Sequence, residues 1–152
     1  MFEELSRLHN LCFPNKPWSA DEFAALQKSG AEIIASERGF IVWRRAADPS
    51  PDGAEAGECE IITIGVHPEH RGIGIGDAMM ALMEKEILKK MYGSVPAART
   101  KIFLEAAADN AAAIALYKKH GFRQIAVRPK YYDGKDAIVM EKILSNKNQL
   151  SP

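Results

Sequence analysis

The chain has 152 residues, of which 47% are hydrophobic and 26% are charged, and its 20 basic residues balance its 20 acidic ones. This length and composition predict one ordinary globular domain with a sizeable buried core. The zero net charge argues against a large binding surface for nucleic acid or for an anionic membrane.

The first half of the chain alternates helical and extended patterns. Its first ten residues, MFEELSRLHN, contain two acids and no long apolar run, so we expect neither a signal peptide nor a membrane segment, and a cytoplasmic protein. Ser19 and Glu22 have the spacing of a helix capping box. The predicted elements are helices over residues 3–11 and from Ser19 to about Gly30, and strands over 31–36, 40–45 and 60–66.

The second half continues the same alternation. Its predicted elements are helices over about 74–91 and 110–120, strands over 101–107, 122–128 and 136–143, a loop over 92–99 and a turn over 131–134. Helices interleaved with strands indicate an α/β (or α+β) fold, with a central sheet of mixed strand direction flanked by helices on both faces. We predict a single domain over residues 1–144 and a polar, frayed tail over 145–152.

The cysteines and histidines do not suggest a disulfide framework or a metal site. Cys12 and Cys59 are isolated in the sequence, and we interpret both as packed thiols. His67 and His70 are three residues apart, but they have no third ligand nearby, so we predict no metal. His9 is expected at the surface or at a helix end.

A glycine-rich segment, HPEHRGIGIGDAMM, joins a predicted strand to a predicted helix. Backbone N–H groups at a helix start favour an anion, and glycines allow a phosphate to approach them. Arg71 would add a full positive charge. The pattern is neither a Walker loop nor a dinucleotide-binding turn. It predicts a phosphate site, with a structural turn as the alternative.

A second group of polar residues lies in FLEAAADNAAAIALYKKHGF. Strand alternation puts Glu105 on the same side as Phe103, in a strand otherwise suited to burial. A carboxylate there is costly unless it is solvated, bonded or used. Asn110 and Tyr117 lie on one stripe of the following helix, so they are expected to face the same cleft. The alternatives are a simple helix cap for Asn110 and a core aromatic for Tyr117.

The segment RPKYYDG brings Arg128, Tyr131 and Tyr132 to a turn. These side chains could line a narrow slot for an extended peptide N-terminus. Alternatively, they belong to a hairpin loop whose tyrosines pack on the sheet.

The segment RGIGIG after VHPEH resembles the loop of the GNAT superfamily of N-acetyltransferases, with Arg71, Gly74 and Gly76 in its three characteristic positions. The resemblance implies the GNAT fold, with a mixed, mostly antiparallel sheet, and a loop that holds the pyrophosphate of acetyl-CoA. Asp77 departs from the small or basic residue usual there. We predict that it points away from the pyrophosphate or caps the helix start, because a carboxylate would repel that group.

Three longer segments, FPNKPWSADEF, LEAAADNAAAIALYKKHGF and VRPKYYDGKDAIVM, resemble the RimI-type ribosomal-protein alanine N-acetyltransferases. The likeness runs from about Leu8 to Lys142. It implies Glu105 as the general base and Tyr117 as the general acid. Gly65 replaces a more usual alanine. The implied cofactor-binding residues are Ile64, Gly65, Val66, Arg71, Gly72, Ile73, Gly74, Ile75, Gly76, Asp77, Asn110 and Tyr117.

The resemblance implies direct transfer of an acetyl group from acetyl-CoA, without a metal and with coenzyme A as product. The acceptor would be the N-terminal α-amine, on an alanine, of a small-subunit ribosomal protein, with Arg128, Tyr131 and Tyr132 binding the peptide. We expect a monomer that binds neither nucleic acid nor membrane. Two alternatives stay open: an acetyltransferase for a lysine or a small-molecule amine, and a non-catalytic acyl-CoA-binding regulatory module.

Overall fold

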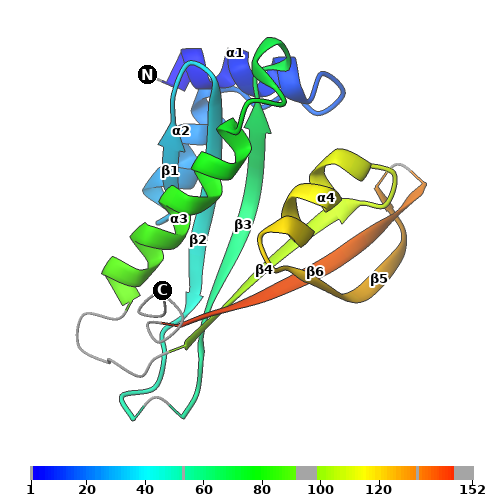
Figure 1. Ribbon diagram of the computed structural model, residues 1–152. Coiled ribbons are helices and arrows are strands. Elements are labelled where there is room, and N and C mark those ends of the chain that lie inside the picture. The colour runs from blue at the N-terminus through cyan, green and yellow to red at the C-terminus, as the bar shows by residue number, and fades with distance from the viewer. Residues whose placement is uncertain (1, 53, 92–98, 133, 146–152) are drawn as a thin grey trace. The chain divides into compact units, whose positions relative to one another are not determined.

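The computed structural model of the protein describes residues 2–52, 54–91, 99–132 and 134–145 (Figure 1). Each helix and strand predicted from the sequence is present in these ranges, and the boundaries differ by a few residues. The elements are α1 (Phe2–Cys12), α2 (Ala20–Lys28), β1 (Glu32–Ala35), β2 (Gly39–Ala47), β3 (Gly57–Val66), a short 3-10 helix (Pro68–His70), α3 (Ile75–Met91), β4 (Arg99–Ala107), α4 (Ala111–Lys119), β5 (Arg123–Tyr132) and β6 (Lys135–Ser145).

The strands are hydrogen-bonded in the order β1-β2-β3-β4-β6-β5. β1 pairs antiparallel with β2, and β6 pairs antiparallel with both β4 and β5, whereas β3 and β4 are parallel. A parallel pair needs a crossover connection, and α3 provides it between β3 and β4. The mixed sheet and its helices confirm the predicted α/β class. Within the described residues, no helix has the length and apolar character needed to cross a membrane.

The chain divides into two compact units. Unit 1 comprises Met1–Arg44 and Ile62–Met83, and unit 2 comprises Arg45–Ile61 and Glu84–Pro152. The single domain predicted over 1–144 stays a prediction. The 92–98 part of the predicted loop and the 146–152 part of the predicted tail lie outside the described residues.

Unit 1 is held together by an apolar core between its two N-terminal helices and its strands. The capping box predicted at the start of α2 is present, because the Ser19 hydroxyl accepts from the Glu22 N–H and the Glu22 carboxylate accepts from the Ser19 N–H. This cap fixes where α2 begins and so places Phe23 in the core. The fully or nearly buried members of the core are Leu5, Leu8, Phe23, Ala31, Phe40 and Val42.

His9 lies inside this core rather than at the surface, with 2% of its area exposed. Its ring stacks on Trp18 at a centroid distance of 4.5 Å and an interplanar angle of 16°. Three more aromatic rings lie 4.9 to 5.5 Å from it, and these belong to Phe13, Phe23 and Phe40. Within the described residues, His9 Nδ1 has no hydrogen-bond partner. Of the two expected positions, the helix end is confirmed, because His9 lies in the last turn of α1. The surface position was wrong, because α1 turns this residue toward the aromatic cluster.

Unit 2 is organised around β4 and β6, whose antiparallel pairing runs from Arg99 opposite Ser145 to Ala107 opposite Ala137. β4 alternates as predicted, because Ile102, Leu104 and Ala106 are buried while Phe103 and Glu105 are half-buried. On β6, the buried side chains are those of Ala137, Met140, Glu141 and Leu144. The charge of the buried Glu141 carboxylate is balanced by an ion pair with Arg123 of β5, with 3.2 Å between Nη2 and Oε2.

The hairpin of β5 and β6 differs from the sequence expectation. The predicted turn over 131–134 is shorter, because β5 continues to Tyr132, which pairs with Lys135. The pairing register shifts between Arg128 and Tyr132. Lys130 lies in this shift with a φ of 52°, and its N–H donates to Asp136 Oδ1 at 3.0 Å. Because tyrosine favours the strand conformation, β5 continues through Tyr131 and Tyr132, and the register shift lies within the strand instead of ending it.

We expect acid to destabilise unit 1 through His9. Burial lowers the pKa of His9, although a hydrogen bond with Asn10 and the charge of Glu22 oppose the shift. In the unfolded chain the pKa is about 6.5. Below that pH the unfolded chain therefore binds a proton that the folded chain excludes. The free energy of unfolding should fall by up to about 1.4 kcal/mol per pH unit as the pH drops below about 6.5.

Urea denaturation at a series of pH values measures this dependence. A His9→Phe variant keeps an aromatic ring against Trp18 but cannot take up the proton. We expect this variant to lose most of the acid dependence between about pH 6.5 and pH 5. If the pH dependence of the free energy of unfolding were unchanged in His9→Phe, titratable groups other than His9 would be its cause.

Candidate functional site

The end of β3 in unit 1 is fixed by two side chains that meet at one carbonyl. Val66 O accepts from Arg71 Nε at 3.0 Å and from Cys12 Sγ at 3.3 Å. On the other side of the same peptide bond, the His67 N–H donates to Arg38 O at 2.7 Å. Burial raises the pKa of the Cys12 thiol, so the thiol keeps its proton and donates it. The backbone orientation at Val66 is therefore held from both sides.

The segment after β3 is a tight turn. The 3-10 helix over Pro68–His70 begins at His67, whose Nδ1 accepts from the Glu69 N–H at 3.1 Å. The ring of His67 thus caps the turn. Within the described residues, no group of three or more His, Cys, Asp or Glu side chains could hold a metal ion.

The glycine loop follows this turn and leads into α3. Gly72 and Gly74 have φ values of 80° and 91°, which L side chains rarely adopt, and a Cβ built on either would meet no heavy atom within 4 Å. The first hydrogen bond of α3 runs from the Ala78 N–H to Gly74 O, at 3.0 Å. The N–H groups of Ile75 and Gly76, in the first turn of α3, have no carbonyl one turn earlier in the helix to donate to. This open, donor-rich helix start fits a phosphate or pyrophosphate group.

The remaining loop residues predicted for the cofactor lie around this helix start. Ile73 is 63% exposed, which is high for an apolar side chain and leaves it open to a ligand. Ile75 and Asp77 lie in the first turn of α3, where a carboxylate is also favourable for the helix dipole. The predicted orientation of Asp77, away from the pyrophosphate or capping the helix, stays a prediction.

Gly65, just before the end of β3, is packed too closely to carry a side chain. A Cβ at this position would lie 2.6 Å from the Phe40 ring and 3.0 Å from Cys12 Sγ. Phe40 is fully buried. These two side chains fill the space that a side chain at position 65 would need. No local sequence pattern predicts this contact, since Phe40, Cys12 and Gly65 are far apart along the chain.

In unit 2, Glu105 is brought together with Arg128. Arg128 Nε and Glu105 Oε1 are 3.1 Å apart, and the Glu105 side chain keeps 23% of its area exposed. The carboxylate thus lies on the open side of β4, as the alternation predicted. Arg128 contacts the predicted base, and its predicted role in binding a peptide stays a prediction. The side chains of Tyr131 and Tyr132 lie outside the described residues, although their backbone belongs to β5.

Asn110 and Tyr117 occupy the two ends of α4. Asn110 caps the helix, because its Oδ1 accepts from the Ala113 N–H at 3.2 Å, so a cofactor contact would use its side-chain NH₂ group. Tyr117 is 6% exposed and makes an edge contact with Phe122, with ring centroids 6.0 Å apart. The two alternative interpretations, Asn110 as a helix cap and Tyr117 as a core aromatic, therefore both fit the observed packing. Neither excludes a role in cofactor binding.

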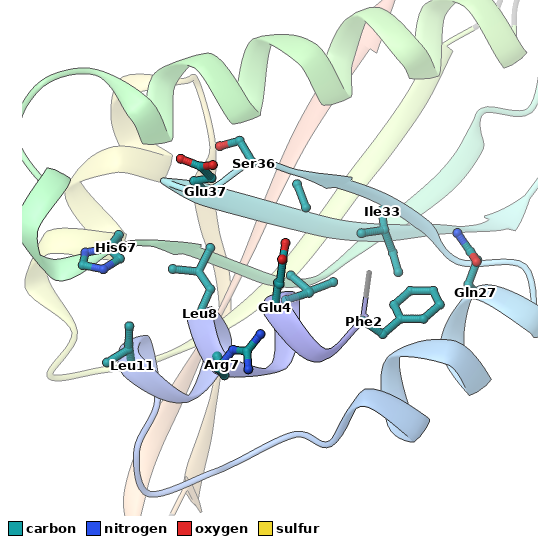
Figure 2. A pocket seen from close by; sticks show the side chains of 12 residues that line it. Phe2, Glu4, Arg7, Leu8, Leu11, Gln27, Ile33, Ser36, Glu37 and His67 are labelled. Atoms are coloured by element: carbon teal, nitrogen blue, oxygen red, sulfur yellow. The ribbon is translucent and has the colours of Figure 1, made fainter.

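Unit 1 also contains a groove of about 670 Å³. Figure 2 shows its walls, formed by one side of α1 and by β1, with His67 at one end. Its lining includes the apolar side chains of Leu8, Leu11 and Ile33 and the charged side chains of Glu4 and Arg7. None of the residues predicted for catalysis or cofactor binding is among its described lining residues.

The model of the acetyltransferase (GNAT) family matches residues 2–122, and the chain belongs to this family. The GNAT fold implied by the sequence is thereby confirmed. The N-alpha-acetyltransferase RimI of Mycobacterium tuberculosis is 38% identical over 87 residues, which are 56% of this chain and 49% of that protein. The chain spans about half the length of the curated relatives it matches.

Two solved structures extend the likeness. The ribosomal-protein-S18-alanine N-acetyltransferase of Escherichia coli has a TM-score of 0.74 and 27% identity, over 95% of this chain and 88% of that one. Arabidopsis thaliana Naa50, in complex with the bisubstrate analogue CoA-Ac-MVNAL, has a TM-score of 0.66 and 25% identity, over 91% of this chain and 89% of that one. The similarity to RimI-type enzymes inferred from the sequence is confirmed by two of these proteins, the RimI of Mycobacterium tuberculosis and the S18-alanine enzyme of Escherichia coli.

We expect Gly65→Ala to destabilise unit 1, because the new methyl group would overlap Phe40 and press on Cys12. Overpacking of this kind lowers the free energy of unfolding by about 1–3 kcal/mol, measured by urea denaturation. The matched control is the same substitution in a Phe40→Leu background, where the space is partly restored and the loss should be smaller. An equal loss in both backgrounds would show that Phe40 is not the obstacle.

Proposed function

We propose that the protein transfers the acetyl group of acetyl-CoA to the N-terminal α-amine of a ribosomal protein, on an alanine. The observation that carries this proposal is the glutamate on β4: Glu105 presents a half-buried carboxylate on the open side of a strand whose other side is core. The names of the relatives support it, since one is a RimI enzyme and another acts on ribosomal protein S18.

The glycine loop is proposed to hold the pyrophosphate of acetyl-CoA. The open space in front of Gly72 and Gly74 leaves room for that group at the start of α3. The guanidinium of Arg71 lies at the same loop, where its Nε already contacts Val66 O. The pantetheine arm would follow Ile64 to Val66, with Asn110 and Tyr117 of α4 as further contacts. An anion-binding helix start next to a fixed strand end supports this assignment.

The acid and base are assigned from the chemistry of the transfer. An α-amine has a pKa of about 7.7–8.0, so roughly a fifth of it is neutral at neutral pH, whereas a lysine amine at about 10.4 is almost entirely charged. A modest base therefore suffices for an N-terminus. Glu105 would take the proton from the attacking amine, and Tyr117 would give a proton to the departing sulfur of coenzyme A.

The acceptor would be an extended peptide N-terminus. Tyr131 and Tyr132, at the end of β5, are proposed to line its slot. A ribosomal protein as acceptor places the reaction in the cytoplasm, where ribosomes assemble. We further propose that the protein acts as a monomer and without nucleic acid, a membrane or a metal.

The test is acetyl transfer to two peptides, followed by mass spectrometry. One peptide starts with a free alanine α-amine, and the other has a blocked N-terminus and an internal lysine. We expect acetylation of the α-amine only, slowed by about 100-fold or more in Glu105→Gln and in Tyr117→Phe, as loss of general acid–base catalysis predicts.

The control is Glu86→Gln, which removes a carboxylate of α3 that pairs with Lys90 at 3.8 Å on the helix surface. This variant should keep the wild-type rate. Acetylation of the lysine alone would reassign the acceptor. Binding of acetyl-CoA without any turnover would instead favour a regulatory acyl-CoA-binding module.

A further inference from the structure

The ion pair between Arg128 and Glu105 crosses the central strand of unit 2. Glu105 of β4 is opposite Val139 of β6, and Arg128 of β5 is opposite Ala137 of the same strand. Val139 and Ala137 are two residues apart, so all four positions share one face of the sheet. The Arg128 side chain therefore extends over β6 to reach a carboxylate two strands away.

The backbone around Arg128 is fixed by contacts of its own hairpin. Two residues beyond Arg128, the Lys130 N–H donates to Asp136 Oδ1 at 3.0 Å, in the register shift of β5. Asp136 O in turn accepts from the Ala108 N–H at 2.9 Å, which ties the start of β6 to the end of β4. Lys135 Nζ also lies 2.6 Å from Asp109 Oδ2, beside the start of α4. These contacts hold β5, which carries Arg128, and β4, which carries Glu105, on the two sides of β6.

The solvent exposure of the Arg128–Glu105 ion pair argues against a main role in stabilising the fold. The Arg128 side chain is 56% exposed, and an isolated ion pair at this level of exposure contributes little to folding. Its effect is local: the Nε contact restrains one carboxylate oxygen, Oε1, and so restricts the rotation of the carboxyl group. A base must be aimed at the proton that it removes, and small errors in aim reduce the rate strongly.

We propose that Arg128 is a positioning residue that aims the Glu105 carboxylate, and not a residue that binds the acceptor peptide. This inference rests on the proposed acetyl transfer, in which Glu105 takes the proton from the amine. It assigns Oε1 to Arg128 and Oε2 to the amine. The two roles open to Arg128 differ in their kinetic effects. A positioning residue changes kcat through Glu105, whereas a peptide-binding residue changes the KM of the peptide whether or not Glu105 is present.

A double-mutant cycle on steady-state acetylation separates the two roles. The four proteins are the wild type, Arg128→Gln, Glu105→Gln and the double variant, assayed with the alanine peptide over a range of concentrations. We expect Arg128→Gln to lower kcat by about 10- to 100-fold while the peptide KM changes less than about twofold. In the Glu105→Gln background the same substitution should have almost no further effect, because the carboxylate that it aims is gone. Arg128→Lys should recover part of the lost kcat.

The matched control is Arg123→Gln, on the same strand. Arg123 also forms an ion pair with a glutamate, Glu141, at 3.2 Å, but this pair is not at the proposed site. The kcat and KM of Arg123→Gln should stay at the wild-type values. This result would show that loss of an arginine from β5 does not by itself lower the activity. Circular dichroism confirms that each variant is folded.

Two results would overturn the proposal on Arg128 while leaving the proposed function intact. One is a rise in peptide KM at constant kcat in Arg128→Gln. The other is an equal loss of activity with and without Glu105, since additive effects mean that the two residues act independently. Absence of turnover by the wild-type protein is a different outcome, because it would overturn the proposed function and this inference with it.

Discussion

The close contact between Gly65 and its neighbours is the constraint on which the predicted cofactor end of unit 1 depends. With no side chain at this position, the Phe40 ring and the Cys12 thiol can pack directly against β3. That packing puts Cys12 within hydrogen-bond distance of Val66 O, where Arg71 also donates. The strand end and the start of the glycine loop are therefore held by the same carbonyl. A fixed strand end is what a loop needs if its backbone N–H groups are to meet a phosphate in one geometry.

The chemistry proposed for unit 2 also depends on a small number of local contacts. Glu105 is the polar exception on a strand whose alternate side chains are buried. The charge of its carboxylate is balanced by the Arg128 guanidinium, and the carboxylate stays partly exposed to solvent. The Asn110 cap begins α4 at a defined residue and so determines where Tyr117 falls, two turns later. The proposed base and the proposed acid thus lie on elements whose positions are fixed by local contacts.

Local patterns in the sequence predicted the fold and the elements that carry the candidate residues. Alternation on β4, the Ser19 capping box and the glycine loop each depend on residues close along the chain, so periodicity and spacing predict them well. What these local patterns did not predict are contacts between distant segments. The burial of His9 depends on aromatic residues from other elements, and the partner of Arg128 depends on a register shift in β5. Pairing register and side-chain packing are tertiary properties, which a local pattern does not encode.

Hydrogen exchange with and without coenzyme A, followed by mass spectrometry, tests most directly whether the end of β3 and the glycine loop form the cofactor site. We predict slower exchange in peptides covering residues 64–78 when coenzyme A is present, because its pyrophosphate would accept from the N–H groups at the start of α3. Peptides from α1 and β1, which line the groove of Figure 2, should not change. Protection of α1 and β1 with no change over residues 64–78 would contradict this assignment and place the ligand in the groove.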